Sequence, residues 1–483
     1  MQFLVITRIL GLLLMVFSTT MLVPVLVDFI YQENEATPFL QSFALVFCAG
    51  LLLYLPFRNQ IKELRLRDGF MVVVMFWVVL GSAGGVPLYL SSAVDLSVTD
   101  AVFEAISGLT TTGATVIVGL DNLPHSILFY RQELQWLGGM GIIVLAVAVL
   151  PMLGIGGMQL YRAETPGPVK DTKLTPRITE TAKALWLIYL ALTVSCGLAY
   201  WLAGMNGFDA ISHAFSTVSI GGFSTHDASM GYFKNQGIEM IAIVFMLLSG
   251  VNFALHFTAL RHKRLTPYLR DAEFKVYISV LAVVSVITIT YLSFTDTFES
   301  HSESIIEGLF QVVSIGTTTG FTTQEYYSWP GFLPVLLLYI SFMGGCAGST
   351  GGGIKVIRIL LLVKQGMREL YRLVHPSAEF AVKIGRKPVP DKVIEAVWGF
   401  FAAYFAISAL MILLLMASGL NQDTAFSAVA ACLNNLGPGL DEVGQNFSSI
   451  NDFAKWVLCL AMLLGRLEIF TLLVLLTPVF WRK

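Results

Sequence analysis

Ten long apolar segments recur along the chain, and each is long enough to cross a membrane. A helix needs about 20 residues to cross the hydrocarbon core of a bilayer. Only 13% of the 483 residues are charged, against roughly 25% in a soluble protein, and the mean hydropathy is +0.73. The sequence therefore predicts an all-α polytopic membrane protein. The predicted spans cover residues 5–30, 38–57, 70–92, 133–153, 184–204, 236–260, 276–294, 331–363, 393–418 and 454–480.

Basic residues indicate how the spans are oriented. They gather in every second connection, within 58–69, 154–183, 261–275 and 364–392. The alternate connections contain or border only Arg131, Lys234 and Lys455. Because short loops rich in Lys and Arg remain in the cytoplasm, we expect both termini and the basic connections to face the cytoplasm.

Each of the last four outer connections contains an apolar stretch that is too short to cross. A helix of about a dozen residues covers only about 18 Å. We interpret the stretches as half-helices that enter from outside, each followed by an extended segment that returns, because irregular backbone at that depth must be buried in protein or line a wet cavity. The stretches cover 99–109, 208–218, 302–315 and 424–433. The expected helix caps are Thr99 or Asp100, Asp209, Ser302, and Asp423 or Thr424.

A short polar tract with glycine follows each half-helix. The tracts read TTGAT (111–115), IGGFS (220–224), TTGFT (318–322) and LGPGL (436–440). Their key glycines lie 109, 98 and 119 residues apart, and this regularity argues for four repeats of helix, half-helix, tract and helix. One such tract alone would be an ordinary turn or helix end. Since each repeat crosses twice, all four half-helices enter from one face and can surround one axis.

The repeats divide the chain into five parts. Two leading helices and a basic loop, residues 1–69, stand outside the repeats. The predicted repeats cover 70–160, 161–270, 271–390, which includes an intramembrane glycine loop, and 391–483.

The chemistry of the tracts favours a monovalent cation. Rings of backbone carbonyls can replace the hydration shell of such an ion, and glycine tolerates the backbone angles that this requires. The C-terminal ends of the half-helices add partial negative charge at the same place. No tract side chain is titratable, so a carbonyl filter is favoured over a charged ring or a proton relay. The candidate filter residues are Thr111, Thr112, Gly113, Ile220, Gly221, Gly222, Thr318, Thr319, Gly320, Gly437, Pro438 and Gly439.

The eighth span is unusual because its middle, 344–353, holds six glycines. Each interior glycine costs a helix about 1 kcal/mol relative to alanine, so this helix should break. We expect a flexible loop beneath the filter that obstructs the pore. The alternative is a glycine face for helix packing, which usually needs a spacing of four. The candidate gate residues of the loop are Gly344, Gly345, Gly348, Ser349, Thr350, Gly351, Gly352 and Gly353.

Arg466 lies within the last span, with apolar runs on both sides. A central arginine costs a membrane helix about 2.5–3.5 kcal/mol, so we expect it to face the bundle interior and to pair there. The expected partners are carbonyls of the glycine loop, or Glu468. On the pore axis, Arg466 would repel a cation and act as part of the gate. Structural pairing without a gating role is the alternative.

Several motifs together resemble one family from end to end. They are SGLTTTGAT (107–115), QWLGGMGIIVLAVA (135–148), SIGGFSTHD (219–227), TTTGFTT (317–323), GGCAGSTGGG (344–353) and NNLGPGL (434–440). With the four repeats and two leading helices, they resemble the Trk/Ktr/HKT superfamily of potassium transporters, most closely the bacterial TrkH-type membrane subunit.

The resemblance implies a potassium filter with one glycine per repeat. The matching positions are Gly113, Gly222, Gly320 and Gly439, with Gly437 as the alternative in the fourth tract. Glycine at all four positions favours potassium over sodium. The segment 344–353 matches the intramembrane gating loop of the family.

The resemblance also implies a place and partners for the chain. It implies a homodimer in the lipid bilayer of the bacterial inner membrane, which docks on a cytosolic nucleotide-binding regulatory ring. Potassium is the expected transported ion, with no organic cofactor on this chain and no nucleic-acid partner.

Two alternatives to a potassium-conducting subunit are a symporter that couples potassium to sodium or protons, and an intramembrane enzyme. No buried chain of Asp, Glu or His for a proton relay is visible in the sequence. No H-E-x-x-H, nucleophile or cofactor motif is present either, so we do not expect an enzyme.

Overall fold

The computed structural model describes residues 1–60, 64–141, 178–385 and 387–482. They form a bundle of helices with one short hairpin of β1 (Lys383–Ile384) and β2 (Lys387–Pro388). Within these residues, six helices are long and apolar enough to cross a membrane, and two further bent helix pairs pass the same test. The predicted all-α polytopic membrane fold is confirmed.

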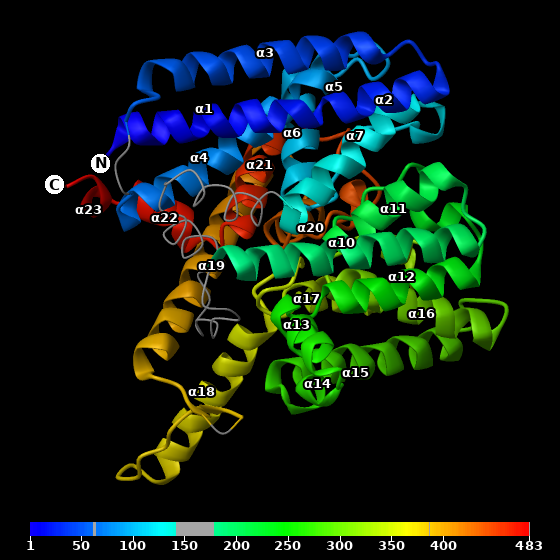
Figure 1. Cartoon of the computed structure of the whole chain (residues 1–483). Helices are drawn as coiled ribbons and strands as arrows, with labels where there is room; N and C mark the ends of the chain where they lie inside the picture. Colours follow the sequence, from blue (N-terminus) through cyan, green and yellow to red (C-terminus); the bar gives the residue numbers. More distant parts are fainter. Residues whose placement is uncertain (61–63, 142–177, 386, 483) are drawn as a thin grey trace.

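The leading helices lie along one side of the bundle (Figure 1). Helix α1 (Phe3–Thr20) continues into α2 (Leu22–Tyr31), and α3 (Ala36–Tyr54) returns beside it to the 3-10 helix η1 (Leu55–Phe57). A Cβ atom added to Gly11 would lie 2.6 Å from the Gly50 oxygen, so the α1 and α3 backbones touch. Close contact of this kind is typical of membrane helices with small residues at their interface.

In each of the four predicted repeats, a long helix is followed by a shorter half-helix and then by further helical segments. The first repeat contains α4 (Leu66–Gly84), α5 (Val86–Leu90), α6 (Val98–Leu109), η2 (Leu120–Asn122), α7 (His125–Trp136) and the π-helix η3 (Leu137–Gly141). The second contains α10 (Ile178–Leu202), α11 (Gly207–Ser219), η4 (Ser229–Tyr232), α12 (Gln236–Ser249), α13 (Phe253–His262) and α14 (Thr266–Arg270). The third contains α15 (Ala272–Phe294), α16 (His301–Gly316), η5 (Tyr326–Ser328), α17 (Leu333–Ser341) and α18 (Val356–Val374). The fourth contains α19 (Asp391–Ala417), α20 (Gln422–Leu433), η6 (Asp441–Val443), α21 (Asp452–Arg466), α22 (Phe470–Leu476) and α23 (Pro478–Trp481).

Two predicted spans are not straight crossings. The sixth bends by 95° between α12 and α13, where the Asn252 side chain accepts a hydrogen bond from Ala254 N and starts a new helix. The tenth bends by 115° between α21 and α22, where Glu468 and Ile469 both have positive φ. Each bend therefore follows from local backbone geometry, which cannot be predicted from a run of apolar residues.

Of the other predicted spans, the eighth is not continuous, and the fourth is described only in part. The eighth is interrupted between α17 and α18, as its glycines predict. The end of the fourth span, beyond Gly141, and the predicted repeat boundary at 160 lie outside the described residues.

The four half-helices α6, α11, α16 and α20 begin in the same way. In each, one side-chain oxygen accepts a hydrogen bond from the backbone N–H three residues later, which satisfies an otherwise unpaired donor. The capping residues are Ser97, Asn206, Ser300 and Asn421. The predicted caps, two or three residues later, are wrong because those residues already lie in the first helical turn.

Both chain ends lie at the same end of the bundle, on the left of Figure 1. The Phe3 and Trp481 rings stack with centroids 6.5 Å apart, and the Arg67 guanidinium donates to the Arg482 carbonyl. That this end faces the cytoplasm stays a prediction.

Candidate ion filter and gate

The four tracts close into a ring through their backbones. One glycine of each tract faces a carbonyl oxygen of the next tract, and the last tract faces the first. A Cβ atom on any of these glycines would lie 2.8 Å or closer to that oxygen, so only glycine fits. The glycines have φ between +81° and +99°, which also favours glycine. The pairs are Gly113 with Gly221 O, Gly222 with Thr319 O, Gly320 with Leu436 O, and Gly437 with Thr112 O.

The fourth tract enters this ring through Gly437, so the predicted alignment of Gly439 is wrong. The residue two positions before each ring glycine has a left-handed backbone, and in the fourth tract this residue is Asn435, with φ +52°. Leu436 N donates to Ala431 O, as Thr112 N donates five residues back in the first tract. Pro438 and Gly439 follow the ring glycine, and a Cβ on Gly439 would meet Val443 instead of another tract.

The other candidate filter residues supply ring carbonyls or directly precede the residues that do. Thr112, Gly221 and Thr319 supply three of the ring carbonyls, while Leu436, which the sequence did not single out, supplies the fourth. Thr111, Ile220 and Thr318 are the left-handed residues that precede them. The Thr112 and Thr319 hydroxyls bond to the hydroxyls two residues earlier at 2.7 Å. These hydroxyls are thus bonded to neighbouring protein groups, and Thr112 Oγ1 also accepts from Asn435 Nδ2 at 2.9 Å, while the contacts around the ring are made by backbone carbonyls.

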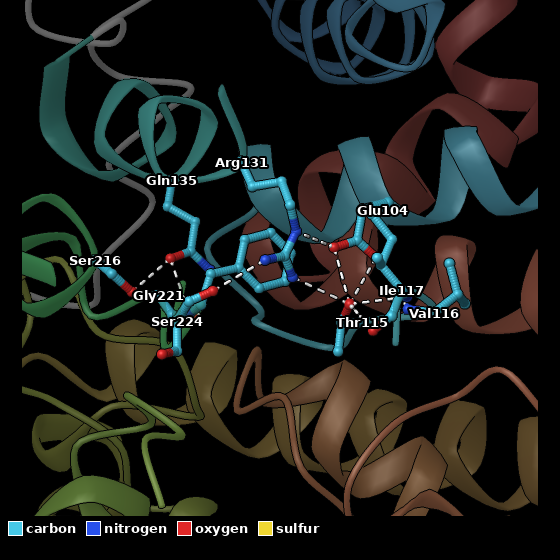
Figure 2. Close-up of polar contacts among 10 residues, drawn as sticks. Glu104, Thr115, Val116, Ile117, Arg131, Gln135, Ser216, Gly221 and Ser224 are labelled. Atoms are coloured by element: carbon cyan, nitrogen blue, oxygen red, sulfur yellow. Dashed lines mark hydrogen bonds and ion pairs between the residues drawn. The ribbon is translucent and has the colours of Figure 1, made fainter. Parts of the chain in front are cut away.

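A buried polar network on α7 lies behind the first two tracts (Figure 2). Arg131 Nε donates to Glu104 at 2.8 Å, and the two side chains are 1% and 0% exposed. Arg131 also donates to Thr115 Oγ1 of the first tract and to Ser224 O of the second. One turn later, Gln135 Nε2 donates to Gly221 O at 2.7 Å. This network was not predicted from the sequence, although Glu104 within the apolar half-helix and Arg131 on α7 were its signal.

The glycine loop lies directly against the tracts. Gly352 N donates to Thr318 Oγ1 at 2.7 Å, and Gly353 N donates to Asn434 O at 2.9 Å. The Thr350 hydroxyl donates to Val218 O, at the end of half-helix α11, at 3.0 Å. The loop is therefore hydrogen-bonded to segments of the second, third and fourth repeats.

The remaining gate candidates pack within the loop or anchor it. A Cβ on Gly344 would meet the Gly352 carbonyl, and Ser349 Oγ donates to Cys346 O at 2.7 Å. Gly345 O accepts from Val356 N, and Gly348 O accepts from Phe253 N. The Lys355 ammonium donates to the Gly351 carbonyl. These bonds fold the segment into a compact loop in place of a helix.

Arg466, at the end of α21, bridges the loop and the first repeat. It donates to Thr350 O at 3.2 Å, to Thr111 Oγ1 at 3.1 Å, and to the Gly138 and Gly139 carbonyls at 2.5 and 2.7 Å. The predicted contact with a glycine-loop carbonyl is therefore present. The other predicted partner, Glu468, forms an ion pair with Arg358.

The comparisons with known proteins agree with this architecture. The model of the family described as "TrkH: Cation transport protein" matches residues 36–482. The chain belongs to the TrkH family.

TrkH-family relatives match the chain over its whole length. The Trk system potassium uptake protein TrkH of Vibrio parahaemolyticus (serotype O3:K6) is 59% identical, and that of Escherichia coli K12 is 56% identical, each over 100% of both chains. The crystal structure of the potassium transporter TrkH from Vibrio parahaemolyticus superposes with a TM-score of 0.91 at 55% identity, covering 100% of both chains. The TrkH-family assignment and the fold are thus supported independently.

Proposed function

We propose that this TrkH-family chain takes up potassium across the membrane through a carbonyl filter formed by the four tracts. The observation that carries the proposal is the closed ring in which four glycines face four backbone oxygens. The relatives that match along the whole chain are named as potassium uptake proteins. Neutral oxygens at close range replace the hydration shell of a monovalent cation without binding it too tightly to leave.

The half-helices contribute to this function through their dipoles. The helices α6, α11, α16 and α20 end immediately before the ring, so their partial negative charge lies next to the bound ion. Among the described residues, no group of three or more His, Cys, Asp and Glu side chains is arranged to hold a metal ion. This favours a backbone site for a monovalent ion over a carboxylate site for a divalent one.

The glycine loop and Arg466 form the proposed gate below the filter. Arg466 binds Thr111 of the first tract and Thr350 of the loop, so its charge lies next to the proposed ion path. A cation at this position repels potassium, and withdrawal of the loop together with Arg466 would remove the barrier.

A homodimer and a cytosolic nucleotide-binding partner complete the proposal, on the strength of the family resemblance. Helix α18 projects from the bundle (Figure 1), and it exposes apolar side chains such as Leu370 and Leu373. An exposed apolar face of this kind is suited to contact with another protein or with lipid.

Ion flux in liposomes tests the proposal directly. The native chain should pass K⁺ and Rb⁺ in preference to Na⁺. Gly113→Ser introduces a Cβ where the Gly221 oxygen lies, so it should lower the K⁺/Na⁺ permeability ratio by about tenfold or more. Equal permeation of K⁺ and Na⁺ by both chains would refute the filter assignment. A reversal potential that shifts with imposed Na⁺ or pH gradients at fixed K⁺ would favour the symporter.

A further inference from the structure

Helix α7 brings two buried polar side chains to the back of the filter ring. Arg131 and Gln135 lie one helical turn apart, so they point to the same side of the helix. Their side chains reach the first and second tracts, as Figure 2 shows. The two residues therefore join tracts whose ring glycines belong to different repeats.

The Gln135 carboxamide forms hydrogen bonds to the second repeat through both its nitrogen and its oxygen. Its nitrogen donates to Gly221 O at 2.7 Å, while its oxygen accepts from Ser216 Oγ at 2.7 Å and from Phe223 N at 3.1 Å. Gln135 is 0% exposed, so these bonds do not compete with bulk water. The carboxamide can hold the Gly221 carbonyl in only one orientation without leaving Ser216 or Phe223 unpaired.

The Gly221 carbonyl is one of the four that form the ring, and it differs from the other three. Among the described residues, no side chain donates to the oxygens of Thr112, Thr319 or Leu436. A donor behind one ring oxygen fixes its position and withdraws electron density from it. Both the size of a carbonyl ring and the field strength of its oxygens bear on which cation it prefers.

Arg131 links the second tract to the first. Its guanidinium lies 4.3 Å from the centroid of the Phe223 ring and donates to Ser224 O at 3.0 Å. Glu104 pairs with the same guanidinium and accepts from Val116 N at 2.9 Å. The ion pair of Arg131 and Glu104 is therefore hydrogen-bonded to both tracts.

We propose that Gln135 is a positioning residue that sets the Gly221 carbonyl, and through it the cation selectivity of the ring. The inference rests on the proposed potassium filter. Gln135 acts on the ion through the backbone and does not contact it.

The decisive measurement is the K⁺/Na⁺ permeability ratio from reversal potentials in proteoliposomes. Gln135→Leu keeps the side-chain volume but removes the donor to Gly221 O. We expect the ratio to fall by about tenfold, while K⁺ conduction continues. The matched control is Gln132→Leu, because Gln132 lies on the same helix, is 0% exposed, and has no hydrogen-bond partner for either carboxamide atom within the described part of the chain. The control should keep the native ratio.

A milder variant covers the case in which Gln135→Leu does not fold. Ser216→Ala removes one of the two donors that orient the carboxamide, and the fourth repeat already has Ala431 at the equivalent position. It should lower the ratio by about two- to threefold. Monodisperse elution and a native melting temperature show that each variant is folded.

The outcomes separate this inference from the proposed function. If the native chain does not discriminate K⁺ from Na⁺, the potassium filter itself fails. If the native chain is selective and folded Gln135→Leu or Ser216→Ala keeps the native ratio, Gln135 only packs the core and the inference is overturned. Loss of selectivity in Gln132→Leu would also overturn the inference, because any change of a buried side chain on α7 would then lower the K⁺/Na⁺ permeability ratio.

Discussion

The two halves of the proposed filter have nearly the same backbone but different surroundings. Behind the first and second tracts lies the buried network of Glu104, Arg131 and Gln135. The third and fourth tracts are instead hydrogen-bonded to the glycine loop through Thr318 and Asn434. Among the described residues, the buried network thus contacts only the first half, whereas the backbone N–H groups of Gly352 and Gly353 in the loop bond to the second half. The proposed gate contacts the first half through side chains, from Arg466 to Thr111 and from Thr350 to Val218 O. Fourfold backbone symmetry does not require four equal roles.

The difference in polar surroundings is visible at one equivalent position of the four half-helices. Nine residues before the ring glycine stand Glu104, His213, Gln311 and Ala428. Glu104 accepts from the Thr115 hydroxyl, and His213 Nε2 bonds to Ser224 Oγ at 2.9 Å. Gln311 has no hydrogen-bond partner for either carboxamide atom among the described residues, and Ala428 has no polar group. At this one position, polar contact with the tracts is thus present in the first two repeats and absent among the described residues of the last two.

The largest effect should come from breaking the charged support of the first half. Glu104→Leu leaves Arg131 buried without its carboxylate, which typically costs about 3–5 kcal/mol. The equivalent change in the other half, Gln311→Leu, removes an unpaired carboxamide and should be neutral or slightly stabilising. Thermal unfolding in detergent measures both, and equal losses of stability would contradict the difference between the halves.

A smaller effect is expected from releasing the loop from the second half. Thr318→Val removes the acceptor of Gly352 N, a bond worth about 0.5–1.5 kcal/mol, so flux through the closed protein should rise by about two- to tenfold. Ile220 holds the equivalent position in the second tract, so a branched apolar side chain fits the backbone there. The K⁺/Na⁺ ratio should stay native, in contrast to Gln135→Leu.

Arg466→Ala provides the positive control for this measurement, because it removes the charge of the proposed barrier. Liposome flux that stays native in folded Thr318→Val, together with an increase in Arg466→Ala, would show that the loop opens independently of the third tract.

The smallest effect concerns the segment that follows the second tract, where His226 lies between Asp121 and Asp209. Burial lowers the pKa of His226, but hydrogen bonds to Asp209 and Asp121 outweigh this, so its pKa is raised. His226 also stacks on Tyr232, and the His213 ring lies 6.5 Å away. The protonated ring joins the first and second repeats through the two carboxylates.

This contribution to stability has a definite sign. A raised pKa in the folded state stabilises the protein below the unfolded pKa, and the stabilisation is lost as pH rises through the folded pKa. The melting temperature should therefore fall slightly between about pH 6 and about pH 9, and His226→Gln should show a shallower slope. Identical slopes for the two chains would contradict the role of His226.

The sequence could predict the repeats because apolar length and glycine clustering are local signals. Three of the four ring glycines follow from matched context, whereas Pro438 between two glycines hides the register of the fourth tract. The cause of the bend after α12 is the Asn252 cap, which a run of apolar residues conceals.

The support behind the filter could not be predicted in the same way. In the sequence, Arg131 is an isolated basic residue at a predicted outer connection. In the fold, it contacts Glu104, 27 residues away, and Ser224, 93 residues away. Long-range pairs of this kind leave no local pattern in one sequence.

The ring of tracts has a consequence for how the protein is made. Asn435 donates to the Thr112 hydroxyl across 323 residues, and Gly437 faces the Thr112 carbonyl. The first tract therefore cannot make these contacts until the last repeat has been synthesised and inserted. The proposed permeation path is therefore completed only when the ring closes, so a truncated chain should not conduct potassium through a partial filter.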